Sequence, residues 1–206
     1  MKNYFTFLFL LISFIASSQI IEVSLTSKQL EEVNQTFANY LNDIQSTNKD
    51  WEKITSYTYP PFFELFTKKD IIQQLKQAFQ NSIYNTTFDV MDVIKAENAF
   101  TFNDILYSKI VYENQFTFYF KEDKTQSEKD FNLYLDFMTE TFQNKFNDMQ
   151  VKRLGNDITF NGEKIILAVF DAALGSWKML EYLENSESFY AMFLPKEVAN
   201  EISAIK

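Results

Sequence analysis

Apolar residues in the N-terminal part of the chain recur every three or four positions, which is the spacing of an amphipathic helix. A first helix is expected to begin at Thr26, because Thr26 and Gln29 have the spacing of a capping box. Trp51 opens a second, short helix, which the Pro60–Pro61 pair should end because a residue before proline avoids helical geometry. Thr67 caps a third helix, so the chain starts with three predicted helices.

The period of the pattern changes to two between residues 88 and 120, and alternation of this kind predicts strands. We expect one strand at 88–92, a second and stronger one over 100–113, and a third from Gln115 to Phe120. In the third strand every second residue is phenylalanine, which is more typical of core packing than of a ligand site.

The clearest helix is predicted from Ser127 onward. Phe131, Leu135, Met138 and Phe142 recur there at helical spacing and line one face. We therefore expect these four side chains to be buried together against the sheet.

Three more strands and a helical tail are expected after this helix. Residues 157–171 are predicted to form a hairpin, because the Asn161–Gly162 pair suits a two-residue turn in which both positions need positive φ. The last strand is expected over 177–183, and a helical tail from Ser186 onward. The predicted order is three helices, three strands, one helix, three strands and the tail, which with antiparallel neighbours is an α+β fold.

The first 18 residues differ in character from the rest of the chain. A single positive charge, Lys2, precedes an apolar run over 4–15 and the small residues 16–18, which is the expected form of a signal peptide. The run is too short for a membrane span, which needs roughly 20 apolar residues. An uncleaved anchor or a buried first helix is the competing interpretation. We expect cleavage after Ser18, which leaves 19–206 as a single domain in the periplasm or the medium.

Two residue types are missing, and their absence excludes several chemistries. Without cysteine or histidine, the chain has no disulfide, no zinc site built on thiolate or imidazole, no Ser–His or Cys–His nucleophile and no cysteine for a lipid anchor. The formal net charge is −9 and Arg153 is the single arginine, so neither nucleic acid nor an anionic membrane is an expected partner. No cofactor and no metal are expected.

The segment Gly175–Leu180 has the sequence Gly-Ser-Trp-Lys-Met-Leu. Together with the element order over 26–184, it resembles the nuclear-transport-factor-2-like families, in which a Gly-x-Trp-Lys strand often closes the sheet. The resemblance implies a strongly bent, mostly antiparallel sheet wrapped by helices, with a pocket between them. The enzyme members usually carry an Asp–His pair in that pocket, and this chain has no histidine. The chain is also similar in form to small secreted proteins of Gram-negative bacteria.

Two aromatic pairs flank the diproline in the segment Tyr57–Phe63, and such a segment would form an aromatic lip over an apolar pocket. We expect an uncharged or apolar ligand between the bent sheet and the helices, because tyrosine rings offer apolar area with a polar tip. The competing interpretation is that these rings fill the core. The predicted ligand-binding residues are Tyr57, Tyr59, Phe63, Tyr112 and Trp177.

One set of polar residues is a candidate to face the pocket. A carboxylate beside a tyrosine hydroxyl can act as base and acid, so Asp104 with Tyr107 or Tyr112, together with Glu181, is considered for such a role. The favoured interpretation is that Asp104 starts a strand and Glu181 points to water. No catalytic residue is assigned.

The remaining carboxylates follow no catalytic or metal-binding pattern. Asp136 and Glu140 lie four residues apart on the solvated side of the predicted long helix, where they do not converge across a cleft. The acidic residues around the start of that helix lack the glycine and the ligand spacing of a calcium loop. These residues are Glu122, Asp123, Glu128 and Asp130.

Three functional hypotheses follow from the sequence. The first is an exported, non-enzymatic protein that binds an apolar small molecule, a peptide or a protein partner through a pocket on the bent sheet. The second is a hydrolase or isomerase-like enzyme on the same fold that works with carboxylate and tyrosine groups. The third is an interaction domain with a filled core and no ligand. The sequence specifies neither the ligand nor the oligomeric state.

Overall fold

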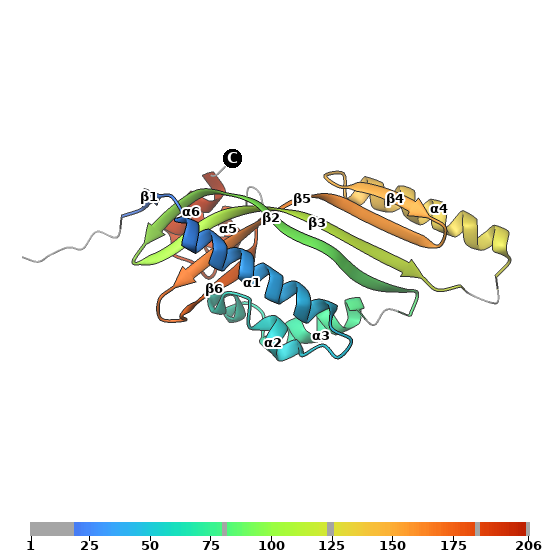
Figure 1. Ribbon diagram of the computed structural model, residues 1–206, viewed down its shortest axis with the longest axis horizontal. Coiled ribbons are helices and arrows are strands. Elements are labelled where there is room, and N and C mark those ends of the chain that lie inside the picture. The colour runs from blue at the N-terminus through green and yellow to red at the C-terminus, as the bar shows by residue number, and fades with distance from the viewer. Residues whose placement is uncertain (1–18, 80–81, 123–125, 184–185, 205–206) are drawn as a thin grey trace, which may run out of the picture.

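The computed structural model describes residues 19–79, 82–122, 126–183 and 186–204. The predicted signal peptide, residues 1–18, lies outside these ranges. The described residues form an α+β fold in which helices wrap a strongly curled antiparallel sheet (Figure 1). This architecture confirms the predicted fold class.

Within the described residues the sheet has six strands in the order β1–β2–β3–β5–β4, and β6 pairs with the second half of β5. The strands are β1 (Ile21–Val23), β2 (Tyr84–Phe102), β3 (Ile105–Phe120), β4 (Gln150–Leu154), β5 (Asp157–Asp171) and β6 (Ser176–Glu181). The helices are α1 (Ser27–Gln45), α2 (Trp51–Thr55), the 3-10 helix η1 (Pro60–Glu64), α3 (Lys68–Phe79), α4 (Glu128–Lys145), α5 (Glu187–Tyr190) and α6 (Lys196–Ala204).

Two long strands, β2 and β3, form the middle of the sheet and are joined by a tight turn at Asn103 and Asp104. Both turn residues have positive φ, 50° and 63°, a conformation that asparagine and aspartate tolerate better than most residues. The register between β2 and β3 shifts three times, first between Phe88 and Val90. Bulges of this kind increase the local twist of a strand, which accounts for the curl of the sheet.

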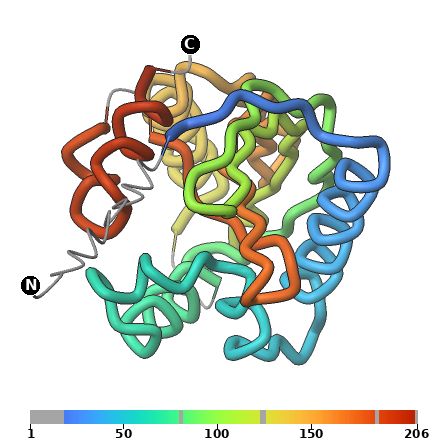
Figure 2. The backbone as a smooth tube through the Cα atoms, turned by 90° about the vertical axis from the view of Figure 1, so that its left-hand side faces the viewer, coloured from blue at the N-terminus to red at the C-terminus, as the bar shows by residue number. Residues whose placement is uncertain are grey.

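Helices cover the sheet on both faces, and successive residues of β3 show this. Leu106 lies in a core with Phe37 of α1, whereas Tyr107 points to the opposite face and lies in a core with Val198 of α6. Seen along the long axis of the molecule, the N-terminal and the C-terminal helices stand on different sides of the strands (Figure 2). Toward the far end of the sheet, α4 packs over Phe120 in a third core.

The structure confirms the prediction for the helix after Ser127. Phe131 and Leu135 are buried on the inner face of α4, and Met138 and Phe142 pack against the same core. The helical period of the apolar residues was therefore sufficient to identify which face of α4 meets the sheet.

The first three predicted helices are also present, with one correction. The capping box of Thr26 and Gln29 is formed at the start of α1, and α3 begins directly after Thr67. The diproline was expected only to end a helix, but Pro60 is the first residue of η1. The fixed φ of proline suits the first position of a helical turn, where its missing N–H is not needed.

The predicted strands need several corrections. The three strands expected between residues 88 and 120 are two, because the tight turn at 103–104 divides the segment 100–113. The last strand ends at Glu181 rather than at Leu183, and the short strands β1 and β4 were not predicted. The expected helical tail is present as α5 and α6.

The hairpin predicted around Asn161 and Gly162 is wrong. Both residues lie inside the continuous strand β5, where Gly162 is paired with Asn114 of β3. A Cβ atom at Gly162 would lie 3.1 Å from the carbonyl oxygen of Asp148, so glycine serves here for a close approach of two backbones. The tight turn before β5 lies at Gly155, which has a φ of 65°.

Among the residues that the structure describes, no helix is both long enough and apolar enough to cross a lipid bilayer.

Candidate functional site

A cavity of about 800 Å³ lies where α1, η1, α3 and α5 meet the curled sheet. The sheet lines it with residues of four strands, among them Met91 of β2, Tyr112 of β3, Ile166 of β5 and Met179 of β6. Segments that are far apart in the sequence therefore share one wall of the cavity.

One face of α3 forms the opposing wall. Ile71, Gln74, Leu75 and Ala78 line the cavity, and their spacing of three and four residues places them on the same side of the helix. Ala78 is the smallest of these side chains, and it is exposed. A larger side chain at this position would take up space in the cavity.

Phenylalanine rings close the side of the cavity where η1 meets α5. The ring of Phe62 lies 5.3 Å from that of Phe66 and 5.7 Å from that of Phe193, measured between centroids. Phe66 remains 40% exposed. Phe62, Phe66 and Phe193 all line the cavity, so this side offers a ligand aromatic faces rather than polar groups.

Three tyrosines, Tyr40, Tyr57 and Tyr112, are among the polar residues that line the cavity. The rings of Tyr40 and Tyr57 meet edge to face with centroids 5.5 Å apart. Burial raises the pKa of Tyr40 to about 12 and also raises the pKa of Tyr112 well above its ordinary value. Both hydroxyls are therefore neutral hydrogen-bonding groups at physiological pH.

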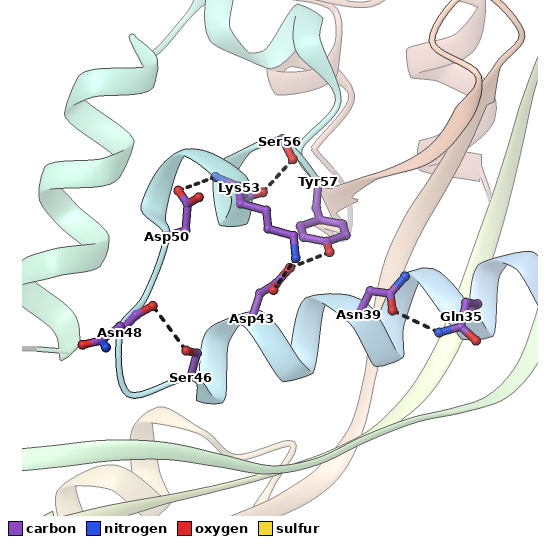
Figure 3. A network of polar contacts seen from close by, with 9 residues as sticks. All are labelled: Gln35, Asn39, Asp43, Ser46, Asn48, Asp50, Lys53, Ser56 and Tyr57. Atoms are coloured by element: carbon purple, nitrogen blue, oxygen red, sulfur yellow. Dashed lines mark hydrogen bonds and ion pairs between the residues drawn. The ribbon is translucent and has the colours of Figure 1, made fainter.

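The position of Tyr57 is fixed by a carboxylate outside the cavity. Its hydroxyl donates a hydrogen bond of 2.7 Å to Oδ2 of Asp43, and Nζ of Lys53 lies 2.7 Å from Oδ1 of the same carboxylate (Figure 3). Burial alone would raise the pKa of Asp43, but the hydrogen bonds from Lys53 and Tyr57 and the charge of Lys53 outweigh it and lower this pKa. Burial, and then the bond to Asp43, hold the pKa of Tyr57 far above its ordinary value.

The main chain around Tyr57 is also held in place. The amide of Met179 donates to the carbonyl of Tyr57 at 2.8 Å, and the amide of Tyr59 donates to the carbonyl of Met179 at 3.0 Å. Thr58 and Met179 thereby form a parallel β-bridge at the edge of β6. The segment between α2 and η1 is thus attached to the sheet by its backbone.

The five predicted ligand-binding residues fall into two groups. Tyr57 and Tyr112 line the cavity. Tyr59 is buried in the core beside Tyr107, to which its hydroxyl is hydrogen-bonded. Trp177 and Phe63 also lie outside the cavity lining.

Trp177 is only 3% exposed and lies in the core under α1. Its Nε1 donates a hydrogen bond of 3.3 Å to Oε2 of Glu32, so it attaches α1 to β6. Phe63 is half-buried, with its ring 6.3 Å from that of Phe62, and does not line the cavity. Of the five residues, Tyr57 and Tyr112 are therefore the ones placed to touch a ligand.

Sequence reasoning did not identify the α3 wall as part of the site. Ile71 and Leu75 lie four residues apart, the spacing of an apolar helix face, which by itself indicates core packing. The polar Gln74 and the small Ala78 on the same face were the available signal that this face does not meet a fully packed neighbour.

The tyrosine–carboxylate pairs that involve Asp104 do not converge. Asp104 is exposed in the β2–β3 turn, whereas Tyr107 is buried and bonded to Tyr59. Glu181 is the exception, because it lines the cavity together with Tyr112.

Some of the other carboxylates have structural partners. Asp136 forms an ion pair of 2.6 Å with Arg153, and Glu122 accepts a hydrogen bond of 3.2 Å from Asn156. Asp123 lies outside the described residues. In the part of the chain that the structure describes, no three acidic side chains are grouped so that they would hold a metal ion.

A second, smaller hollow of about 390 Å³ lies between the β1–β2 edge and α6. Glu22 and Glu201 line it, together with Ser24 and Asn98. Its acidic and polar lining does not suit an apolar ligand, so the larger cavity is the candidate site.

Searches against protein-family models, curated proteins and solved structures find no match to this chain. The resemblance to the nuclear-transport-factor-2-like families therefore stays a prediction.

Proposed function

We propose that this protein is an exported, non-enzymatic binding protein for an apolar small molecule, which it holds in the cavity between α3 and the curled sheet. The observation that supports this most is the cavity itself, with a volume of about 800 Å³. Small-molecule sites are concave, mostly apolar and roughly 300–1,000 Å³ in volume, with a few polar groups that orient the ligand. Aliphatic and phenylalanine side chains with three tyrosine hydroxyls match this description.

The expected affinity follows from burial of apolar area. A ligand that loses ~400 Å² of apolar surface to the cavity gains about 10 kcal/mol at ~25 cal/mol per Å². Association costs at least about 4 kcal/mol in lost freedom of movement. At most about 6 kcal/mol remains, which corresponds to a dissociation constant on the order of tens of micromolar or weaker.

The hydrogen bond between Tyr57 and Asp43 is suited to holding the Tyr57 side chain in position rather than to transferring a proton. Both oxygens of Asp43 accept hydrogen bonds, from Tyr57 and Lys53, and its lowered pKa makes it a weak base. Because the pKa of Tyr57 is raised, this hydroxyl is a poor acid near neutral pH. The enzyme hypothesis therefore gains no support from the carboxylate closest to the cavity tyrosines.

Binding of an environment-sensitive hydrophobic dye tests the proposal. The folded protein should bind the dye saturably, and Ala78→Trp should abolish saturable binding because Ala78 lines the cavity and the indole would occupy part of it. Gln77→Trp is the matched control, since Gln77 is an exposed neighbour on α3 that does not line the cavity. Far-ultraviolet circular dichroism establishes that both variants are folded.

Two results would count against a binding protein. One is a folded wild-type protein that binds no apolar dye at a saturable site. The other is equal dye binding by Ala78→Trp and Gln77→Trp. Either result would make the interaction domain without a ligand the better hypothesis.

A further inference from the structure

Among the described residues that line the large cavity, Glu181 is the single charged one. It is the last residue of β6 and is paired with Ile166 of β5, which also lines the cavity. The carboxylate of Glu181 forms no ion pair with the residues the structure describes. The Tyr190 hydroxyl instead donates to its backbone carbonyl at 2.9 Å.

Several lysines on the surrounding elements are engaged elsewhere. Lys53 pairs with Asp43 at 2.7 Å, and Lys178 on β6 donates to the carbonyl of Ser56 at 2.7 Å. Lys164 on β5 is bound by Asp148. None of these side chains is therefore placed to neutralise Glu181.

Electrostatic and aromatic features of the cavity both favour a ligand with a positive charge. The carboxylate of Glu181 contributes, after burial and Tyr40, to the raised pKa of Tyr112, which indicates that its field reaches the cavity wall. Tyr40, Tyr57 and Tyr112 add neutral aromatic rings, whose faces attract cations. A carboxylate ligand would instead meet a like charge without a lysine or arginine among the described lining residues.

We infer that the ligand of this cavity is an apolar molecule with a cationic head, an alkylammonium compound in chemical class, with its head at Glu181 and its apolar body between α3 and the sheet. The inference rests on the proposed binding function and adds the sign of the ligand's charge. Because Glu181 is exposed, its attraction alone is worth roughly a threefold to fivefold gain in affinity. Contact of the cation with the tyrosine faces raises the expected preference to roughly tenfold.

Three probes with eight-carbon chains test this inference: octyltrimethylammonium, octanol and octanoate (whose eighth carbon is the carboxylate), titrated below their aggregation concentrations by calorimetry. The wild-type protein should bind the ammonium probe roughly tenfold more tightly than the alcohol, and the carboxylate most weakly. Glu181→Gln should reduce ammonium binding several-fold and leave the alcohol unchanged. Glu140→Gln removes the same charge from the exposed surface of α4 and should leave all three affinities unchanged.

The outcomes separate this inference from the proposed function. Equal binding of octanol and octyltrimethylammonium, or an equal loss in Glu181→Gln and Glu140→Gln, would overturn the charge preference while the cavity remains a binding site. Tighter binding of octanoate than of octanol would overturn it as well. Failure of all three probes to bind would contradict both the inference and the proposed function.

Discussion

The hydroxyl of Tyr57 donates a 2.7 Å hydrogen bond to Asp43, which lies 14 residues earlier in the chain. Tyr57 belongs to the segment between α2 and η1, and Asp43 belongs to the last turns of α1. This bond joins the wall of the cavity to the helix that covers the sheet, so it should contribute to stability as well as to the shape of the site.

Tyr57→Phe removes this bond and keeps the ring. We expect a loss of about 1–2 kcal/mol in the free energy of unfolding, at the lower end of the range for a hydrogen bond to a charged group, because Asp43 is partly exposed. Urea denaturation measures the change. Tyr119→Phe is the control, because Tyr119 is 39% exposed and its change should stay within about 0.5 kcal/mol. Equal effects of the two substitutions would show that the Asp43 bond adds nothing.

High pH should destabilise the fold through its buried tyrosines. The pKa of Tyr40 and that of Tyr190 are each raised by burial to about 12, whereas an unfolded tyrosine has a pKa of about 10. A raised folded-state pKa gives stability that is complete below the unfolded pKa and is lost as the pH rises through the folded value. The free energy of unfolding should therefore fall between pH 10 and about 12.

Tyrosinate absorbance, followed alongside urea unfolding at each pH, measures this effect. Some tyrosines should ionise only at a pH well above 10 or together with unfolding. Tyr40→Phe should remove one of these ionisations at high pH. A single transition of all tyrosines near their ordinary pKa, with circular dichroism unchanged, would contradict the prediction.

Leu135 on α4 tests the third core. It is 0% exposed, so Leu135→Ala should cost about 2–5 kcal/mol, the range for a large-to-small change in a packed interior. Leu133 lies on the same helix and is 58% exposed, and Leu133→Ala should change stability by less than about 0.5 kcal/mol. Denaturant unfolding of both variants provides the comparison, and similar losses in the two would mean that α4 does not pack as described.

Export is tested by N-terminal sequencing of the protein recovered from outside the cytoplasm. The mature chain should begin at Gln19 or within a residue or two of it, because the small residues before Gln19 suit a signal peptidase. Recovery of exported protein that still begins at Met1 would contradict cleavage.

The sequence by itself determined those elements whose signal is local. The capping box at Thr26 and the apolar stripe of α4 through Leu135 depend on residues three or four positions apart, and both are present as predicted. The α+β class was predictable for the same reason, since the helical and the alternating periods occupy separate parts of the chain.

The tertiary structure decided what depends on distant partners. Asn161 and Gly162 have the local preference for a turn, but pairing with β3 keeps them inside one long strand. The same holds for the site: Tyr57 and Tyr59 are two residues apart, yet one lines the cavity and the other is bonded to Tyr107 in the core. Hydrophobicity along the chain measures how strongly a side chain avoids water. It carries no information on whether the space beside that side chain is filled, because that space is bounded by residues more than a hundred positions away.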